Sequence, residues 1–398
     1  MHDLDDVALL DRVRGDMAMS RVHFNHAGTS PTPVPALTAM LDHLAREAEV
    51  GGYEAAADAA EALAAVPSAV APLFGPGVAG DEVAITESAT RAWETVLWAL
   101  AETFAYGPAD RVLIDGFTYA TTYTTVERLR LARGVSVEVV PSIEDGTVDV
   151  EQLGRMLDPA TRLVAITHMP THLGTRTDVA AVGRVLRGSG AVFAVDVAQT
   201  MGQMPLDLKG IGGHVAFAPG RKFARAPRGT GMLYVDADLA ETLVPLSPGM
   251  GTVGPAAPGE FVLPPAARRF DSFESGHAAR LGLGEAARYA QSIGLDRIER
   301  LVAARSRQVT ELLAGSAGVR LVASTDAVGI ISFTHDRLPP HDVQARLAAA
   351  GVNVWVNPAG GAPLDGAARP VLPSVRVSPH YCTDAADLAT LGSALRTL

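Results

Sequence analysis

Residues 217–235 read FAPGRKFARAPRGTGMLYV, and this stretch decides the fold that we expect for the chain. Lys222 lies before a loop rich in proline and glycine, and the loop leads into an apolar strand at 232–235. The chain has only two lysines, Lys209 and Lys222. A lysine, unlike an arginine, can lose its proton and form a Schiff base with a carbonyl compound. Lys222 is therefore the first candidate for a catalytic residue.

Three arginines lie close to Lys222 in the sequence: Arg221, Arg225 and Arg228. We expect their positive charges to lower the pKa of the lysine and to suit a phosphate group. The alternative is a solvated basic loop between two elements, because a short motif is only a hypothesis until its structural context is known.

Composition places the chain among ordinary globular proteins. It has 398 residues, of which 48% are hydrophobic and 19% charged, so we expect one large domain and one smaller domain. The net charge of −11 argues against nucleic acid or an anionic membrane as a partner. The single cysteine, Cys382, excludes an internal disulfide and favours a reducing compartment. With no signal peptide or apolar span in the sequence, we expect a cytoplasmic location.

Strand-like runs alternate with helical patterns over most of the chain, which predicts parallel βαβ units with helices on both faces of a sheet. The fold class is therefore α/β, with a mainly parallel seven-stranded sheet in a large domain at 36–265. The seven expected strands lie at 82–86, 111–115, 135–140, 162–168, 191–197, 215–218 and 232–235.

The C-terminal part has a different pattern and predicts a smaller α+β domain at 266–398. We expect one long helix at 278–313, strands at 319–323, 329–334, 352–357 and 374–378, and helices at 340–350 and 385–395. Residues 1–35 are expected to lie near this domain. The Gly- and Pro-rich segment at 247–265 is interpreted as a linker or as a loop that covers the active site.

Polar residues follow several of the expected strands, at the edge of the sheet where ligands bind. Asp196 can pair with a protonated pyridine nitrogen, although an acid at a strand end is more often a helix cap. Ala89 and Thr90 open a helix whose backbone N–H groups suit a phosphate, but a plain N-cap is the alternative. Tyr119 offers a flat face to a ring, or packs in the core. Together, in this order along the chain, these weak signals support one another.

These motifs resemble the class V aminotransferases, the cysteine-desulfurase-like group of fold-type I pyridoxal-phosphate enzymes. The resemblance covers nearly the whole chain. It includes the AT turn at 89–90, the DxxQ at 196–199, the lysine loop GRKFARAPRGTG and the arginine strand SVRVSPH at 374–380. Within the group, GRKFARAPRGTG and EAEVGGYEAA at 47–56 look most like C–S lyases that process cysteine S-conjugates, of the ergothioneine and lincosamide pathway type.

The resemblance implies pyridoxal 5'-phosphate as cofactor, a small amino-acid substrate and a homodimer with both active sites at its interface. Lys222 would be the catalytic residue and hold the cofactor as a Schiff base. Other cofactor contacts would come from Ala89, Thr90, Tyr119, Thr171, Asp196, Gln199 and Arg221. Of these residues, Asp196 would pair with the pyridine nitrogen. Gln199 and Thr171 would contact the phenolic oxygen, and Tyr119 would stack on the face of the ring. The substrate side would include Asn25, His26 and Arg376, with Arg376 pairing bidentately with the α-carboxylate.

Some positions depart from the family pattern. Pro219 lacks the hydroxyl that relatives use for the phosphate, and Arg221 replaces a common histidine. Glu274, in a segment that reaches into the neighbouring subunit's site in relatives, receives no role. His168, His172, His277 and His380 also lie near the expected site and are interpreted mainly as structural or as shaping the substrate pocket.

The choice of reaction depends on whether the chain has a cysteine nucleophile near the substrate. A desulfurase needs a thiolate nucleophile shortly before the substrate arginine, and residues 357–373 contain none. No HExxH-type motif supports a metal site. We therefore expect cleavage of the Cβ–S bond of an S-substituted cysteine, giving a thiol, pyruvate and ammonia. Transamination, epimerisation, decarboxylating oxidative deamination and a non-enzymatic fold relative stay open as alternatives.

Overall fold

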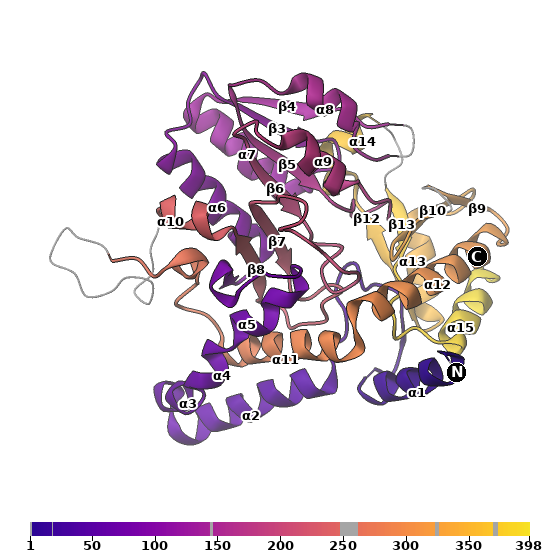
Figure 1. The fold of residues 1–398 in the computed structure, drawn as a ribbon. Helices are drawn as coiled ribbons and strands as arrows, with labels where there is room; N and C mark the ends of the chain where they lie inside the picture. The colour runs from indigo at the N-terminus through magenta and orange to yellow at the C-terminus, as the bar shows by residue number, and fades with distance from the viewer. Residues whose placement is uncertain (1, 18, 144–145, 247–261, 323–325, 369–372) are drawn as a thin grey trace.

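The computed structural model describes residues 2–17, 19–143, 146–246, 262–322, 326–368 and 373–398, and Figure 1 shows their arrangement. A seven-stranded sheet lies at its centre, in the order β2-β8-β7-β6-β5-β3-β4. Every strand except β8 runs in the same direction, which confirms the mainly parallel sheet. The strands are β2 (Val83–Thr86), β3 (Arg111–Asp115), β4 (Ser136–Val140), β5 (Thr161–Thr167), β6 (Val192–Asp196), β7 (Val215–Pro219) and β8 (Gly231–Val235).

Apart from the edge strand β4, nearly every residue in these strands is buried, as in a parallel sheet that is covered on both faces. Alternate side chains enter two separate cores: Leu113 and Phe193 belong to one, and Val112 and Ala194 to the other. The second core is completed by α6 (Ala89–Thr103), α7 (Ala120–Arg133) and α10 (Ala237–Thr242). The first is completed by α5 (Val66–Val70), α8 (Val150–Met156), α9 (Val179–Leu186) and α11 (His277–Ile293).

The single long helix expected at 278–313 is wrong, because the chain forms two helices there. The first is α11, and the second is α12 (Leu295–Ala314). Gly294 separates them at φ 91°, a backbone conformation that glycine adopts without steric cost. α11 packs on α5 and on α2 (Val34–Val50), the long helix at the bottom of Figure 1. The short helices α3 (Gly52–Asp58), α4 (Ala60–Ala64), η1 (Ala71–Leu73) and η2 (Gly80–Glu82) follow α2 in the chain.

A second, four-stranded antiparallel sheet has the order β12-β13-β10-β9 and packs with α12, α13 (Pro340–Ala349) and α15 (Ala385–Leu395). Its strands are β9 (Val319–Leu321), β10 (Ile331–His335), β12 (Trp355–Asn357) and β13 (Ser374–Val377). The expectation of a single strand at 352–357 is wrong, because two strands form there. The second is β12, and the first is β11 (Val352–Asn353), which pairs with β1 (Val22–His23) because the N-terminal segment supplies its hydrogen-bond partners.

The N-terminal segment contacts the C-terminal part of the chain in several places. Besides the β1–β11 pair, Arg14 of α1 (His2–Gly15) forms ion pairs with Asp384 and Asp387, and Asn25 forms a β-bridge with Ser378. The domain bounds at 35 and 265 stay predictions. The remaining short helices are η4 (Ala266–Phe270), η5 (Ala359–Gly361) and α14 (Pro363–Ala368). Most of the expected loop at 247–265 lies outside the described residues. None of the described helices is both long and apolar enough to span a membrane.

Candidate active site

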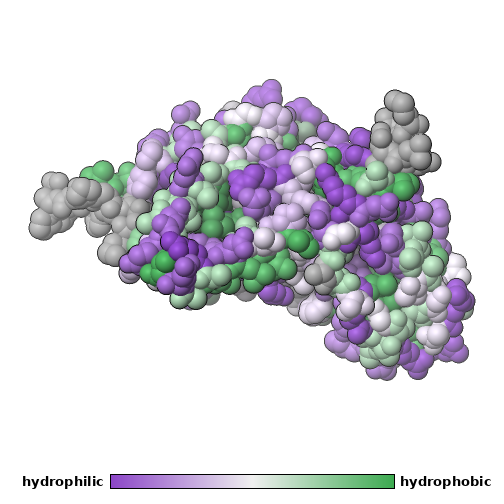
Figure 2. Space-filling model, turned by 90° about the horizontal axis from the view of Figure 1, so that it is seen from below, coloured by the Kyte–Doolittle hydropathy of each residue, from purple (hydrophilic) through white to green (hydrophobic). Residues whose placement is uncertain are grey.

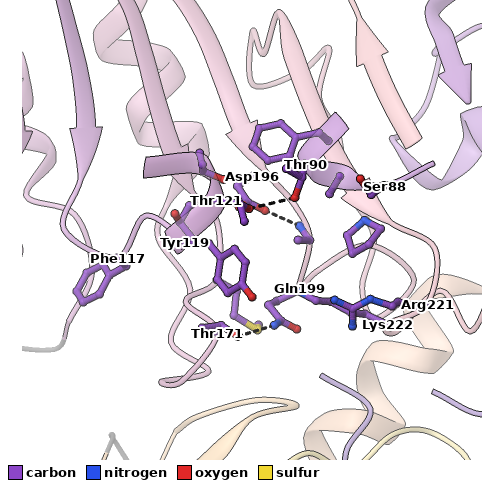
Figure 3. Close-up of a pocket in the computed structure, with 17 residues that line it drawn as sticks. Ser88, Thr90, Phe117, Tyr119, Thr121, Thr171, Asp196, Gln199, Arg221 and Lys222 are labelled. Atoms are coloured by element: carbon purple, nitrogen blue, oxygen red, sulfur yellow. Dashed lines mark hydrogen bonds between the residues drawn. The ribbon is translucent and has the colours of Figure 1, made fainter. Parts of the chain in front are cut away.

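The carboxyl ends of β2, β3, β5, β6 and β7 meet at one edge of the large sheet, and an inner cavity of about 90 Å³ lies there. All eight residues expected to contact the cofactor line it together, from five separate segments of the chain (Figure 3). They are Ala89, Thr90, Tyr119, Thr171, Asp196, Gln199, Arg221 and Lys222.

Lys222 follows β7 and is 8% exposed. Its amine has no hydrogen bond or ion pair with any of the described residues, and its Nζ lies 5.7 Å from the centroid of the Tyr119 ring. Burial, together with the charges of Arg221 and Arg376, lowers the pKa of Lys222 to about 7, although the charge of Asp196 opposes the shift. Near neutral pH a large fraction of this amine is therefore unprotonated, the form that attacks a carbonyl.

Arg225 does not take part in the site. Its guanidinium is buried and donates hydrogen bonds to the carbonyl oxygen of Pro31 and to the hydroxyl of Tyr381. Of the three arginines expected to lower the pKa of Lys222, Arg221 does so, whereas the expectation is wrong for Arg225 and Arg228. Arg225 instead anchors the loop to Pro31 and Tyr381. Only the tertiary fold decides on which side of the loop each arginine lies.

Asp196 ends β6, the strand next to β7. Its Oδ1 accepts a hydrogen bond from the backbone N–H of Ala198 at 2.9 Å, and no cation of the described residues pairs with it. Burial raises the pKa of this carboxyl, although nearby Lys222 opposes the shift. A buried carboxylate without a cationic partner is costly, and a protonated pyridine nitrogen would offset that cost.

Gln199 and Thr171 form a pair at another wall of the cavity. Gln199 Nε2 donates to Thr171 Oγ1 at 3.0 Å and to the carbonyl oxygen of Ala27 at 3.3 Å. Gln199 Oε1 is buried without a hydrogen-bond partner. An orphaned polar atom of this kind is expected where a ligand completes the site.

The N-terminus of α6 also faces the cavity. Ser88 caps the helix by accepting from the N–H of Arg91, so the plain N-cap interpretation holds for Ser88, while Ala89 and Thr90 line the cavity. Thr90 Oγ1 donates to Thr121 Oγ1 at 3.1 Å. Free backbone N–H groups and the helix dipole make such a terminus suitable for a phosphate. Sequence reasoning missed Thr121, which lines the cavity beside Thr90 and offers a hydroxyl that Pro219 lacks.

A second, outer chamber of about 340 Å³ adjoins the inner cavity, and the two share Tyr119, Thr171, Arg221 and Lys222 as lining residues. Arg376 of β13 enters it and is 3% exposed. Its guanidinium donates to Thr171 O at 2.9 Å, to Thr171 Oγ1 at 3.0 Å and to Asn25 Oδ1 at 3.3 Å. Burial lowers the pKa of Arg376 to about 9, yet arginine keeps its proton in proteins. No carboxylate of the described residues balances this charge, so the chamber suits an anionic ligand.

The histidines are mostly structural. His26 lines neither cavity: its Nδ1 lies 2.9 Å from Ser30 Oγ, and its ring packs edge-on against His23 and His380. This geometry does not support the expected substrate contact of His26, because the ring contacts Ser30, His23 and His380 and lines neither cavity. His172 does line the chamber, with its Nε2 2.7 Å from Asp365.

Two of the three remaining histidines have ring partners within the protein. His380 Nε2 lies 2.9 Å from the carbonyl oxygen of Phe223, His277 packs against His43, and His168 is buried next to β5.

Sequence reasoning missed several chamber residues. Trp355 and Asn357 of β12 line it, beside Arg228, which the sequence places near Lys222 without assigning it to a substrate chamber. A lone tryptophan in a short strand carries no functional signal by itself, because most such residues are packed in cores. Their place in the chamber depends on how the second sheet docks on the first.

The inner cavity fits pyridoxal phosphate: it presents an amine of lowered pKa, an unpaired carboxylate, an aromatic face and a helix N-terminus around one space. The fold and these residue types define a fold-type I pyridoxal-phosphate enzyme. Residues 22–391 match the family described as Aminotransferase class-V, so the chain belongs to that family, whose cofactor is pyridoxal phosphate. The C–S lyase subgroup stays a prediction, as do the individual residue roles.

Comparison with known proteins agrees with this assignment. The chain is 29% identical over 396 residues to a probable cysteine desulfurase of Methanothermobacter thermautotrophicus, and the match covers 97% of each chain. The apo structure of cysteine desulfurase from Thermococcus onnurineus superposes with a TM-score of 0.87 at 24% identity, again covering 97% of each. The cystine C–S lyase C-DES, in complex with its reaction product cysteine persulfide, has a TM-score of 0.84 at 23% identity, covering 95% of this chain and 97% of that chain. These structural likenesses support the fold.

Proposed function

We propose that the protein cleaves the Cβ–S bond of an S-substituted cysteine by β-elimination, releasing a thiol, pyruvate and ammonia. C–S chemistry is suggested by relatives that are named as cysteine desulfurases and by the likeness to a cystine C–S lyase. The observation that carries the choice of β-elimination is the position of the chain's one cysteine.

Cys382 lines neither cavity and is 1% exposed. Its Sγ faces His26 Nε2 at 3.8 Å, and burial raises the pKa of the thiol. Persulfide transfer to the protein requires a thiolate that reaches the substrate sulfur. The thiol of Cys382 neither reaches the cavities nor ionises readily. Its position therefore favours a reaction in which the substrate sulfur leaves with its own substituent.

The chain's own residues suit the steps of an elimination. Arg376 binds and orients the α-carboxylate with two parallel N–H groups. Lys222, as a neutral amine, accepts the α-proton at Nζ, and the Cβ–S bond then breaks with its electron pair going to sulfur. When bound, the cofactor supplies an electron sink for the pair that the α-proton leaves behind. The thiolate takes up a proton, and water converts the remaining fragment to pyruvate and ammonia.

The test is product analysis with a panel of cysteine S-conjugates. We expect free thiol and pyruvate in equal amounts, and Cys382→Ser should retain the activity within about twofold, since a buried thiol has no role in elimination. Alanine or a protein-bound persulfide as product, lost in Cys382→Ser, would identify a desulfurase instead. An aldehyde with loss of carbon dioxide would indicate oxidative deamination, and a keto acid that retains sulfur would indicate transamination.

We also propose that the protein is a homodimer. On the side where α2 lies, hydrophobic residues are exposed among hydrophilic ones (Figure 2), and they include Leu41 and Leu44 of α2 and Tyr53 of α3. Exposed apolar groups gathered on one face are typical of interaction sites, and two-fold symmetry is the commonest assembly. Light scattering at working concentration should give twice the 41.4 kDa chain mass. A fully active monomer would refute this proposal.

A further inference from the structure

The outer chamber carries more positive charge than a single α-carboxylate requires. Three arginines line it, Arg221, Arg228 and Arg376, together with Lys222, and none of its described lining residues is an aspartate or glutamate. This excess is local, because the whole chain has a net charge of −11. Lys222 and Arg376 already have roles in the proposed reaction, and Arg221 also faces the inner cavity. Arg228 is the one of these residues that has no role assigned so far.

Arg228 is an exposed residue of the lysine loop and precedes Gly229, which has φ 81°. It makes no hydrogen bond or ion pair with any described residue. Its charge nevertheless contributes to lowering the pKa of Arg221, so the two guanidinium groups lie near each other. Two like charges at the wall of a chamber repel each other, and an anion between or beside them removes that cost.

Trp355 gives the chamber a flat apolar surface. It lies directly opposite Arg376 in the antiparallel register of β12 and β13, so both side chains project from the same face of the sheet. The indole is 46% exposed, although most tryptophans are largely buried. A group attached to the substrate whose carboxylate is held by Arg376 would therefore meet the indole.

The size of the chamber leaves room for such a group. Its volume of about 340 Å³ lies in the range of pockets that hold small ligands of roughly 300–1,000 Å³. Unsubstituted cysteine would leave the indole and Arg228 without contacts.

We propose that the chamber selects cysteine S-conjugates whose S-substituent carries a second anionic group, with Arg228 pairing with that group and Trp355 packing against the body of the substituent. This inference rests on the proposed function, because it places an S-substituted cysteine in the chamber. The substituent leaves as its thiol and its anionic group is unchanged, so the reaction itself is the same.

Three matched conjugates test the inference: S-phenyl-L-cysteine, S-(4-carboxyphenyl)-L-cysteine and S-(4-carbamoylphenyl)-L-cysteine. The last two have nearly the same shape and differ in charge. Binding to the holoenzyme is measured from the change in cofactor absorbance on rapid mixing, and thiol release is measured separately. We expect the carboxy conjugate to bind about tenfold more tightly than the carbamoyl one, as for one charge-assisted contact in a partly exposed site, with the preference falling as salt rises.

Variants assign the effect to residues. Arg228→Gln should remove the preference for the carboxy conjugate, whereas Arg228→Lys should retain part of it. Trp355→Leu should weaken the binding of all three conjugates by similar factors, because it removes an apolar surface and no charge. Arg187→Gln serves as the matched control, since Arg187 is an exposed arginine that does not line the chamber. Unchanged melting temperatures would show that the variants are folded.

The outcomes separate the inference from the proposed function. Equal binding of the carboxy and carbamoyl conjugates, or a preference that survives in Arg228→Gln, would overturn the inference even if thiol is released from all three. A charge preference that depends on Arg228, without any release of thiol, would support the anionic subsite and refute the elimination.

Discussion

The inner cavity and the outer chamber are neighbours that share Lys222 and Tyr119, but they are built differently. Most of the inner cavity comes from loops at one edge of a single sheet, where buried strands hold each side chain in place. The outer chamber is assembled from residues 25–29, the lysine loop and the second sheet. The cofactor is reused in every catalytic cycle, so its site needs walls that hold each side chain firmly in place. A substrate pocket made from separate segments can change without disturbing the cofactor. Substitutions in the two regions should therefore have separable effects.

The largest effect is expected for Lys222→Ala, which removes the residue that we propose both as the covalent link to the cofactor and as the base. Activity should fall by at least the 10²–10⁴-fold typical of a lost general base. Cofactor should no longer stay attached after borohydride reduction, as shown by mass spectrometry of the intact protein. Lys209→Ala is the matched control, because Lys209 forms an ion pair with Glu82 and lines neither cavity. A labelled peptide containing Lys209 would contradict the assignment.

Asp196→Asn tests the inner cavity without changing its shape. Removal of the carboxylate takes away the proposed partner of the pyridine nitrogen, so we expect turnover to fall by about 10²–10³-fold, the loss typical of one preorganised electrostatic contact. The absorption spectrum of the bound cofactor should change as well. Normal turnover together with an unchanged spectrum would show that the carboxylate has another purpose, such as capping the turn at Ala198.

Arg376→Gln should affect the outer chamber more than the inner cavity, which Arg376 reaches only through Thr171 and through its charge near Lys222. Loss of two charge-assisted hydrogen bonds to the α-carboxylate, at about 1.5 kcal/mol each or more, predicts a rise in KM of about 100-fold. The cofactor spectrum should stay that of the wild type. Steady-state kinetics and absorbance measured on the same preparation check both parts. A loss of cofactor in this variant would break the distinction between the two regions.

The smallest effect is a pH dependence of the inner cavity. With the pKa of Lys222 lowered from 10.5 to about 7, capture of pyridoxal phosphate by cofactor-free protein should be about tenfold faster at pH 8 than at pH 6. The unfolded chain still holds this proton between pH 7 and 10.5, whereas the folded chain has lost it. The contribution of Lys222 to stability must therefore rise with pH across that window.

Thermal melting of cofactor-free protein checks the second part. The difference in melting temperature between the wild type and Lys222→Met should change in favour of the wild type as pH rises from about 7 to about 10. A difference that does not depend on pH would mean that the pKa of Lys222 is not lowered.

Much of the inner cavity could be predicted because local sequence carries its signals. Asp196 follows an apolar strand and Lys222 precedes a glycine-rich loop, and parallel strands bring their carboxyl ends to one edge. The prediction did less well where contacts between distant segments decide the outcome. Arg225 was grouped with the site but anchors the loop to Tyr381, and His26 packs against other histidines instead of lining the chamber.

The sequence by itself determined the strands, the helices on both sides of the sheet and the chemistry at its edge, since each depends on residues close together in the chain. Only the tertiary structure decided that the strand expected at 352–357 divides between two sheets, and that Trp355 faces the same chamber as Arg376. The reason is physical: hydrogen-bond pairing and burial between remote segments depend on how two sheets dock, and local patterns contain no information about that docking.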